Sequence, residues 1–159
     1  MAASCVAIME DGVVAAVGIE GFEGSVCYRL GVLRSLLARL DAGMTIGDSA
    51  MGEWVWRSVR DAELLRDVPE DIWRVSCKPS EAPALMERSG AVGWYFDWAG
   101  GRIWVRMPEG QDWRAAPGTY DGPATLVPGS AKTRAVLPVF EHAAAGVAQY
   151  SHWLRAPFR

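Results

Sequence analysis

One segment, residues 94–106, limits the fold of this chain more than any other part of the sequence. It consists of two aromatic-rich arms, 94–98 and 102–106, on either side of Ala99-Gly100-Gly101. Glycines supply the positive φ angles that tight hairpin turns require, and aromatic and β-branched side chains suit pleated strands. The segment therefore predicts a β-hairpin within residues 92–107.

Alternation along the two arms assigns each side chain to one face of this hairpin. One face is largely apolar, and the other mixes aromatic rings with an aspartate and arginines. We expect the mixed face to be the functional one, although its residues alone do not define a function. The apolar face holds Trp94, Phe96, Trp98, Ile103 and Val105, and the mixed face holds Tyr95, Asp97, Arg102, Trp104 and Arg106.

Length and composition indicate one globular domain. The chain has 159 residues, of which 50% are hydrophobic and 22% charged, and this length is enough for a sizeable core. A formal net charge of −3 and scattered basic residues disfavour nucleic acid as a partner. Eight tryptophans are many for this length. We interpret them mainly as core and sheet-to-helix contacts, and the alternative is a flat ligand stacked on indole rings.

Cysteine and histidine spacing predicts neither disulfides nor a metal site. Cys5, Cys27 and Cys77 are odd in number and far apart, so we expect reduced thiols in a cytoplasmic protein. The N-terminus lacks the basic-then-apolar order of a signal peptide, and no apolar run is long enough to span a membrane. His142 and His152 are ten residues apart on an expected helix, or about 15 Å, which is too far to share a metal ion.

The first sixty residues predict a hairpin followed by two helices. β-like runs at 5–9 and 13–19 surround an Asp-Gly turn. Apolar residues then recur at spacings of three and four from Val26 to Leu40, which predicts an amphipathic helix with Ser25 as its N-cap. A second helix is expected over about 49–63, capped by Asp48 or Ser49.

From residue 72 onward the order of elements predicts β-α-β-β-α-β, the ferredoxin-like arrangement. The expected elements are a strand at 72–77, a helix from Ser80 to about Arg88, the hairpin, a short helix or loop at 109–117, and a strand at 124–127. A terminal helix over 140–158 is expected to dock on the sheet. The predicted fold class is α+β: a single domain over 1–159 in which an antiparallel sheet carries helices packed on one face.

No known catalytic or phosphate-binding motif is present. The glycines lack the strand–loop–helix context of a dinucleotide-binding or P-loop motif, and nothing resembles a nucleophile elbow. Asp97 and Arg102 are of more interest, because they lie about two positions from the hairpin turn on opposite arms and are near cross-strand neighbours. One interpretation is a surface ion pair. The other is that the pair orients a carboxylate ligand or a partner chain, because a guanidinium suits bidentate carboxylate recognition.

Four short strings, taken in order, carry a resemblance to a known family. They are GIEGFEGSV at 18–26, IWRVSCKPS at 72–80, FDWAGGRIW at 96–104 and GPATLV at 122–127. Together they look like the C-terminal part of the FAD-binding subunit of bacterial glycolate oxidase, which belongs to the FAD-linked oxidases of the vanillyl-alcohol-oxidase type. The resemblance extends over about residues 13–140. Each string alone is weak, and four in register are fairly specific.

The resemblance implies a cap or substrate domain without its flavin-binding partner. In that family an N-terminal domain binds FAD through a glycine-rich loop, and the C-terminal domain covers the flavin ring and contributes substrate contacts. The sequence departs from the family pattern at Gly122-Pro123, where a glycine and a histidine are usual, and at 154–159, where Phe-Asp-Pro and then Asn-Pro-Gly-Arg are usual. FAD is therefore expected on a separate domain or subunit, and none is expected for this chain alone.

Two functions follow as expectations. The first is the cap-domain part of a flavin-dependent, glycolate-like 2-hydroxy-acid oxidoreductase, inactive alone, with Tyr95, Asp97, Arg102 and Trp104 facing flavin, substrate or an interface. Its partners would be an FAD-domain polypeptide, other oxidase subunits or a second copy, with no nucleic acid and no transmembrane segment. The second is a non-catalytic binding or assembly module, because aromatic and arginine-rich surfaces are typical of interfaces.

Overall fold

A computed structural model describes residues 2–9, 12–38, 45–66, 70–141, 150 and 153, with side chains from Ala15 onward. Nearly all of the helix expected over 140–158, together with His142 and His152, lies outside the described residues.

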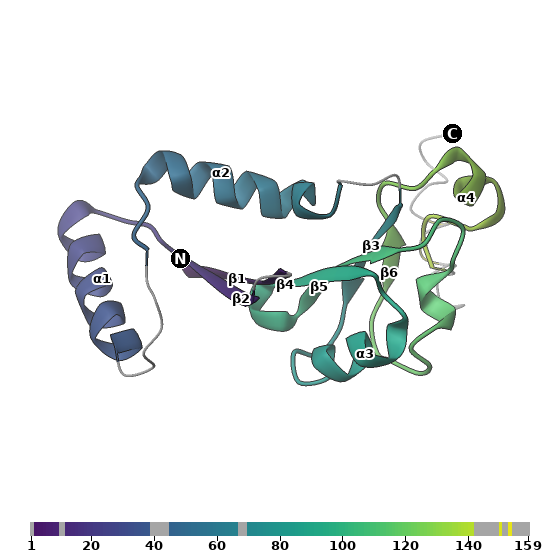
Figure 1. Ribbon diagram of the computed structural model, residues 1–159, viewed down its shortest axis with the longest axis horizontal. Helices are drawn as coiled ribbons and strands as arrows, with labels where there is room; N and C mark the ends of the chain where they lie inside the picture. Colours follow the sequence, from purple (N-terminus) through teal and green to yellow (C-terminus); the bar gives the residue numbers. More distant parts are fainter. Residues whose placement is uncertain are drawn as a thin grey trace.

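Six strands form one sheet in the order β2-β1-β4-β5-β3-β6 (Figure 1). Every neighbouring pair is antiparallel. The last four strands have the order of a ferredoxin-like core, with an α-helix in the first crossover and only a three-residue 3-10 turn in the second, and the N-terminal hairpin extends this core through β4. The strands are β1 Ala2–Met9, β2 Gly12–Ile19, β3 Asp71–Ser76, β4 Gly93–Asp97, β5 Arg102–Met107 and β6 Ala124–Leu126.

Four α-helices and three short 3-10 turns connect these strands in the described residues. The Asp48 side chain caps α2 by accepting a hydrogen bond from the Met51 N–H, as expected. The predicted Ser25 cap of α1 is wrong, because the helix begins earlier, after Phe22, and has no side-chain cap. The helical elements are α1 Glu23–Leu37, α2 Ser49–Arg60, α3 Ala82–Ser89, α4 Ala131–Val136, η2 Glu63–Leu65, η3 Trp98–Gly100 and η4 Trp113–Ala115.

The α+β class is confirmed, because one antiparallel sheet is combined with helices. The helices are not confined to one face, because the central strands carry apolar residues on both faces. On one face α3 and η4 pack on Trp73, Val75, Ile103 and Val105. On the other face α2 and η2 pack on Ile72, Tyr95 and Trp104, and Figure 1 shows α2 and α3 on opposite sides of the sheet. The expectation that helical elements pack on one face is therefore correct only for α3 and η4, which connect the last four strands. A second helical layer forms because the opposite face is also apolar.

The aromatic hairpin forms as β4 and β5, and its alternation is as predicted along the strands. Trp94 and Phe96 lie against the α3-side cluster, whereas Tyr95 lies in the α2-side cluster. The turn is longer than expected, because Trp98 and Ala99 adopt positive φ values of 54° and 52° in the left-handed region. The prediction that Trp98 shares the apolar face is therefore wrong: the turn removes it from the alternation, and it is 65% exposed.

No helix among the described residues is long and apolar enough to cross a membrane.

Candidate functional site

Three of the four family-like strings meet at one end of the sheet. The Cys77 N–H donates to the Gly101 carbonyl at 3.3 Å, which joins the end of β3 to the hairpin turn. The Ser76 N–H donates to the Pro123 carbonyl at 3.0 Å, which joins β3 to the segment before β6. We call this place the hairpin-turn site and define it as residues 76–79, 97–102 and 121–123.

Glycines allow the backbones to approach closely at the hairpin-turn site. Gly122 has φ +141°, and a Cβ at this position would collide with the Ser76 carbonyl oxygen. Gly100 has φ +92°, and a Cβ there would lie 3.3 Å from the Pro79 Cβ. Both positions therefore require glycine for conformation and for space. This packing explains why the strings at 96–104 and 122–127 contain glycines at these positions.

Asp97 and Arg102 form the expected cross-strand pair at the base of the turn. They are direct partners in the β4–β5 ladder, and an Arg102 Nη1 lies 3.7 Å from Asp97 Oδ2. The other carboxylate oxygen, Oδ1, accepts from the Trp98 N–H at 2.7 Å. Asp97 is 8% exposed, so its carboxylate is held mainly by the hairpin itself. The pair thus fixes the direction of the Arg102 guanidinium at the end of the sheet.

Trp98 forms the exposed surface of the hairpin-turn site. The Arg102 guanidinium carbon lies 3.6 Å from the centroid of the Trp98 ring, which is a cation–π contact. Buried Arg102 Nε has no hydrogen-bond partner among the described residues. A bulky residue with positive φ is a genuine backbone outlier, and such strain is concentrated at functional sites. The site therefore presents an aromatic face backed by a partly exposed cation.

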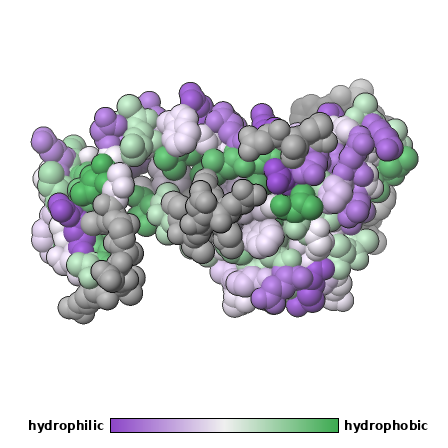
Figure 2. Space-filling view, in the orientation of Figure 1, coloured by the Kyte–Doolittle hydropathy of each residue, from purple (hydrophilic) through white to green (hydrophobic). Residues whose placement is uncertain are grey.

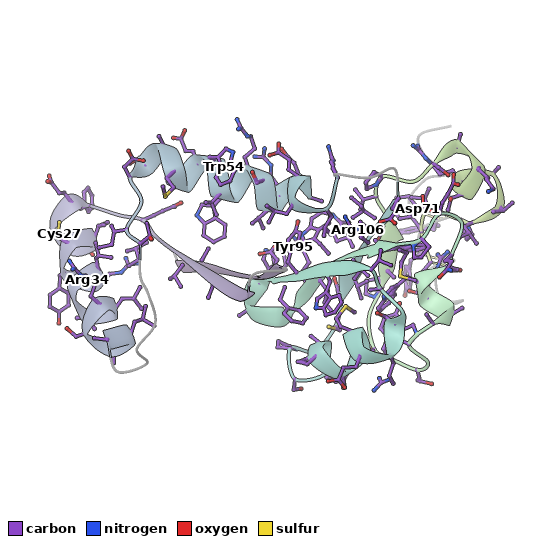
Figure 3. The ribbon with its side chains drawn as sticks, viewed as in Figure 1. Cys27, Arg34, Trp54, Asp71, Tyr95 and Arg106 are labelled. Atoms are coloured by element: carbon purple, nitrogen blue, oxygen red, sulfur yellow. The ribbon has the colours of Figure 1, made fainter. Side chains whose placement is uncertain are left out.

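Tyr95 and Trp104 lie between the sheet and α2, away from the exposed part of the hairpin-turn site. They are 1% and 4% exposed, and their rings stack with centroids 6.3 Å apart. The Tyr95 hydroxyl donates to the Val59 carbonyl of α2 at 2.7 Å, and Figure 3 shows Tyr95 beneath this helix. The structure thus separates the four predicted site residues into two pairs. Asp97 and Arg102 belong to the hairpin-turn site, whereas Tyr95 and Trp104 anchor α2.

The charged and sulfur-containing groups around the site do not form a nucleophilic centre. Exposed Lys78 bridges Asp121 at 3.4 Å and Glu81 at 3.5 Å, and its hydrogen bond to Asp121 is the main cause that raises the pKa of the ammonium. Burial, and then the charge of Glu81, raise the pKa of the Cys77 thiol. Its Sγ donates to the Gly100 carbonyl at 3.8 Å. A raised pKa makes thiolate scarce, so the arrangement suits binding better than covalent catalysis.

Sequence reasoning missed the most buried carboxylate of the described chain, Asp71. It is fully buried at the opposite end of β3, and it accepts hydrogen bonds from Gly110 N, Ser130 N and Thr133 Oγ1 at 2.8, 2.9 and 2.6 Å. The only local signal is Ser130, whose side chain also caps α4 by accepting from the Thr133 N–H. Asp71 joins β3, the loop after β5 and α4, so its role is to hold the domain together.

Among the described residues no group of three or more histidine, cysteine, aspartate or glutamate side chains is placed to hold a metal ion.

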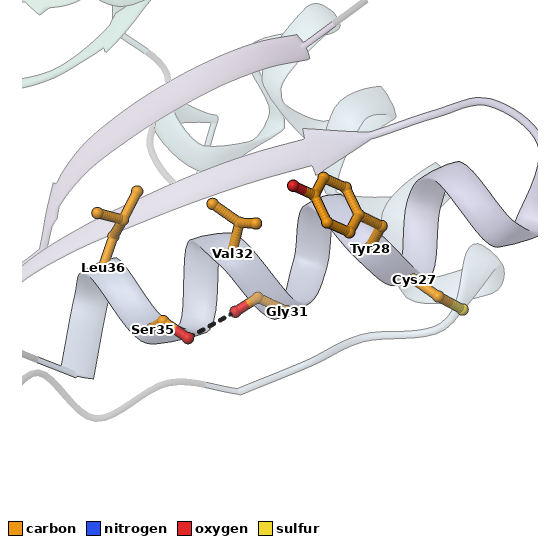
Figure 4. A pocket seen from close by; sticks show the side chains of 6 residues that line it. All are labelled: Cys27, Tyr28, Gly31, Val32, Ser35 and Leu36. Atoms are coloured by element: carbon orange, nitrogen blue, oxygen red, sulfur yellow. Dashed lines mark hydrogen bonds between the residues drawn. The ribbon is translucent and has the colours of Figure 1, made fainter.

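A second surface lies on α1, which has no buried residue. Its predicted apolar stripe is only partly covered: Val26, Leu30, Leu33 and Leu37 are intermediate in exposure. The adjacent side carries a shallow groove of about 440 Å³, shown close up in Figure 4, and Figure 2 shows hydrophobic residues at the surface of this helix. Residues lining the groove are Cys27, Tyr28, Gly31, Val32, Ser35 and Leu36.

Comparisons with known proteins found no match to this chain among family models, curated proteins or solved structures.

Proposed function

We propose that this chain is the cap or substrate domain of a flavin-dependent, glycolate-like 2-hydroxy-acid oxidoreductase, and that it acts with an FAD-binding domain carried by another polypeptide or subunit. The observation that supports this proposal is the hairpin-turn site. Three strings that resemble the family are far apart in sequence, and they converge there through backbone hydrogen bonds and glycine contacts. Residues that share one site are expected to share one function.

The described residues fit one edge of a flavin–substrate complex better than a whole dinucleotide. The hairpin-turn site offers the exposed Trp98 indole and the Arg102 guanidinium, which suit an aromatic ring edge and an anionic group. The structure does place Gly18, Gly21 and Gly24 where β2 leads into α1, contrary to the expectation that no glycines have a strand–loop–helix context, but their spacing is neither Gly-x-Gly-x-x-Gly nor that of a P-loop, the usual cradles for a pyrophosphate. FAD bound to the other domain would accept the hydride from the substrate α-carbon.

Arg102 is the proposed carboxylate-binding residue of this chain. Its side chain keeps 22% exposure, and its contact with Asp97 is long at 3.7 Å, so the guanidinium can serve a second carboxylate. Asp97 is the positioning residue, because its other oxygen is held by the Trp98 N–H. Trp98 covers one side of the guanidinium and keeps water from that side.

The test supplies an FAD-binding domain in trans. The purified chain is mixed with the FAD-binding domain of a bacterial glycolate oxidase, and glycolate-dependent dye reduction is measured with each part alone and with both. We expect activity only from the mixture. Arg102→Gln should then lower kcat/KM for glycolate by about 10–100-fold, the effect of losing a charge-assisted hydrogen bond.

Arg60→Gln is the matched control, because Arg60 is an exposed arginine paired with Asp61 on α2. It should leave kcat/KM unchanged. Failure of the two parts to associate, together with no activity, would contradict the proposal.

The alternative proposal, a non-catalytic binding or assembly module, is favoured by a separate observation. None of the described side chains from 15 to 57 is buried, although this stretch carries exposed Phe22, Tyr28 and Trp54. Such a surface is typical of a protein interface. Association with the FAD-binding domain without any oxidation of glycolate would support this alternative.

A further inference from the structure

β2 is an unguarded edge of the sheet. It lies at one end of the strand order, and within the described part of the chain it pairs with β1 alone. Its eight residues, GVVAAVGI, include no charge and no proline. Natural edge strands are usually short, charged, interrupted by proline or bulges, or covered, because an open edge offers unpaired N–H and C=O groups to another strand. β2 has none of the protective sequence features.

The sequence of β2 is complementary to itself when it is read in the antiparallel direction. Centring a two-fold axis on Ala15 places Gly12 opposite Gly18 and Val13 opposite Val17 of the second strand. Val14 then faces Ala16, and Ala15 faces its own copy. All these neighbours are small or β-branched, so the paired strands bring together no charge and no bulky clash. An isologous contact requires this kind of self-complementarity.

Exposed hydrophobic side chains on and beside β2 support a partner at this edge. Val17 of β2 is 48% exposed, and Phe22, three residues after the strand ends, is 91% exposed. Exposed hydrophobic residues of this size that cluster on a surface mark interaction sites.

We propose that β2 pairs antiparallel with β2 of a second copy of this chain and so joins the two six-stranded sheets into one. The two-fold axis is perpendicular to the sheet, so strand directions reverse across it and the two hairpin turns point in opposite directions. α2 covers the same sheet face in both copies, because the axis does not exchange the faces. Trp56 of α2 already packs on Gly18 of β2, which leaves Ala15 and Val17, on the opposite face by alternation, exposed. This inference goes beyond the proposed function and does not depend on flavin.

The first test measures the mass of the purified chain by size exclusion with light scattering across a dilution series. We expect a dimer of twice 17.3 kDa. Val17→Lys places a lysine on the edge opposite Val13 of the second copy and should weaken association at least about tenfold. Val136→Lys is the matched control, because Val136 is an exposed valine on α4, and it should leave the dimer unchanged. A monomeric chain at all concentrations would overturn the proposal, as would equal effects of the two lysines.

The second test does not depend on whether the lysine variant folds. In a Cys27→Ser background, Ala15→Cys should give a linked dimer under mild oxidation or with a short thiol-reactive linker. Cross-strand Cβ atoms of directly opposed residues lie about 4.5–5.5 Å apart, which is close to disulfide geometry. Val136→Cys in the same background should remain unlinked. Equal linking of the two variants, or none, would overturn the proposal. Both tests read association of the chain with itself, so their outcome is separate from glycolate oxidation.

Discussion

The described part of the chain divides at Ser58 into two regions that use apolar residues differently. Before Ser58, from Ala15 to Arg57, none of the described side chains is buried. After it, Trp73, Ile103 and Val105 are fully buried. Both regions contain strands or helices with apolar patterning, so patterning alone does not secure burial. The two regions differ in how many other elements pack on each of their strands and helices.

Central strands are covered twice, whereas the N-terminal hairpin lies at the edge. β3 and β5 have α3 and η4 on one face and α2 on the other. β2 has one neighbouring strand, and α1 has no buried residue. The first region therefore has apolar surface to offer a partner, and the second region supplies the stable core from which that surface projects. Each prediction below makes the same change in both regions.

The largest contrast is expected from truncating one tryptophan in each region. Trp73→Ala should lower the free energy of unfolding by about 3–5 kcal/mol, because it leaves a cavity between the sheet and its covering elements. Trp54→Ala should change it by less than about 1 kcal/mol, because Trp54 is 54% exposed. Urea unfolding followed by circular dichroism measures both. Similar losses would mean that the N-terminal region is as well packed as the core.

An intermediate contrast is expected from adding a methyl group to one glycine in each region. Gly122→Ala should lower the free energy of unfolding by about 2–3 kcal/mol, because the backbone is left-handed and a Cβ would meet the Ser76 carbonyl. Gly31→Ala should raise it by about 0.5–1 kcal/mol, because no atom lies within 4 Å and alanine favours the helix. The same urea titration reports both signs. A stabilising Gly122→Ala would contradict the close approach of β3 to the segment before β6.

The smallest contrast concerns thiol reactivity. Exposed Cys27 should react with iodoacetamide several-fold faster than half-buried Cys77 near neutral pH, because burial restricts access to Cys77 and raises the pKa of its thiol. Since a raised pKa lowers the thiolate fraction, the rate at Cys77 should increase as the pH rises towards that pKa. Peptide mass spectrometry separates the two sites, and denatured protein is the control in which the difference should shrink. Equal rates in the native chain would contradict the assigned packing of Cys77.

Part of the hairpin-turn site was predictable because it depends on near neighbours. The period of two along residues 94–106 assigned Tyr95 and Phe96 to opposite faces, and the structure agrees. The same spacing placed Asp97 beside Arg102. Trp98 was placed on the wrong surface, because alternation does not indicate where a strand ends and a left-handed turn begins.

The covering of the sheet could not be predicted, because it joins segments far apart in the chain. Tyr95 reaches the Val59 carbonyl of α2 across 36 positions in sequence. The buried Asp71 accepts from Thr133 across 62 positions. Neither contact leaves a local pattern. α4 was missed for a different reason, because its six residues are too few to show a helical period.

The sequence by itself therefore determined the hairpin, the succession of the four strands and the helix α3 after residue 70, and the cross-strand pairing of Asp97 with Arg102, since turn chemistry and alternation act between residues close in the chain. Only the tertiary structure decided which mixed-face residues remain accessible. α2 lies over Tyr95 and Trp104 and leaves Arg102 with the exposed Trp98 at the end of the sheet. The physical reason is that burial depends on which distant element packs on a face of the sheet. The alternation of residues along a strand is the same whether a helix covers that face or solvent does.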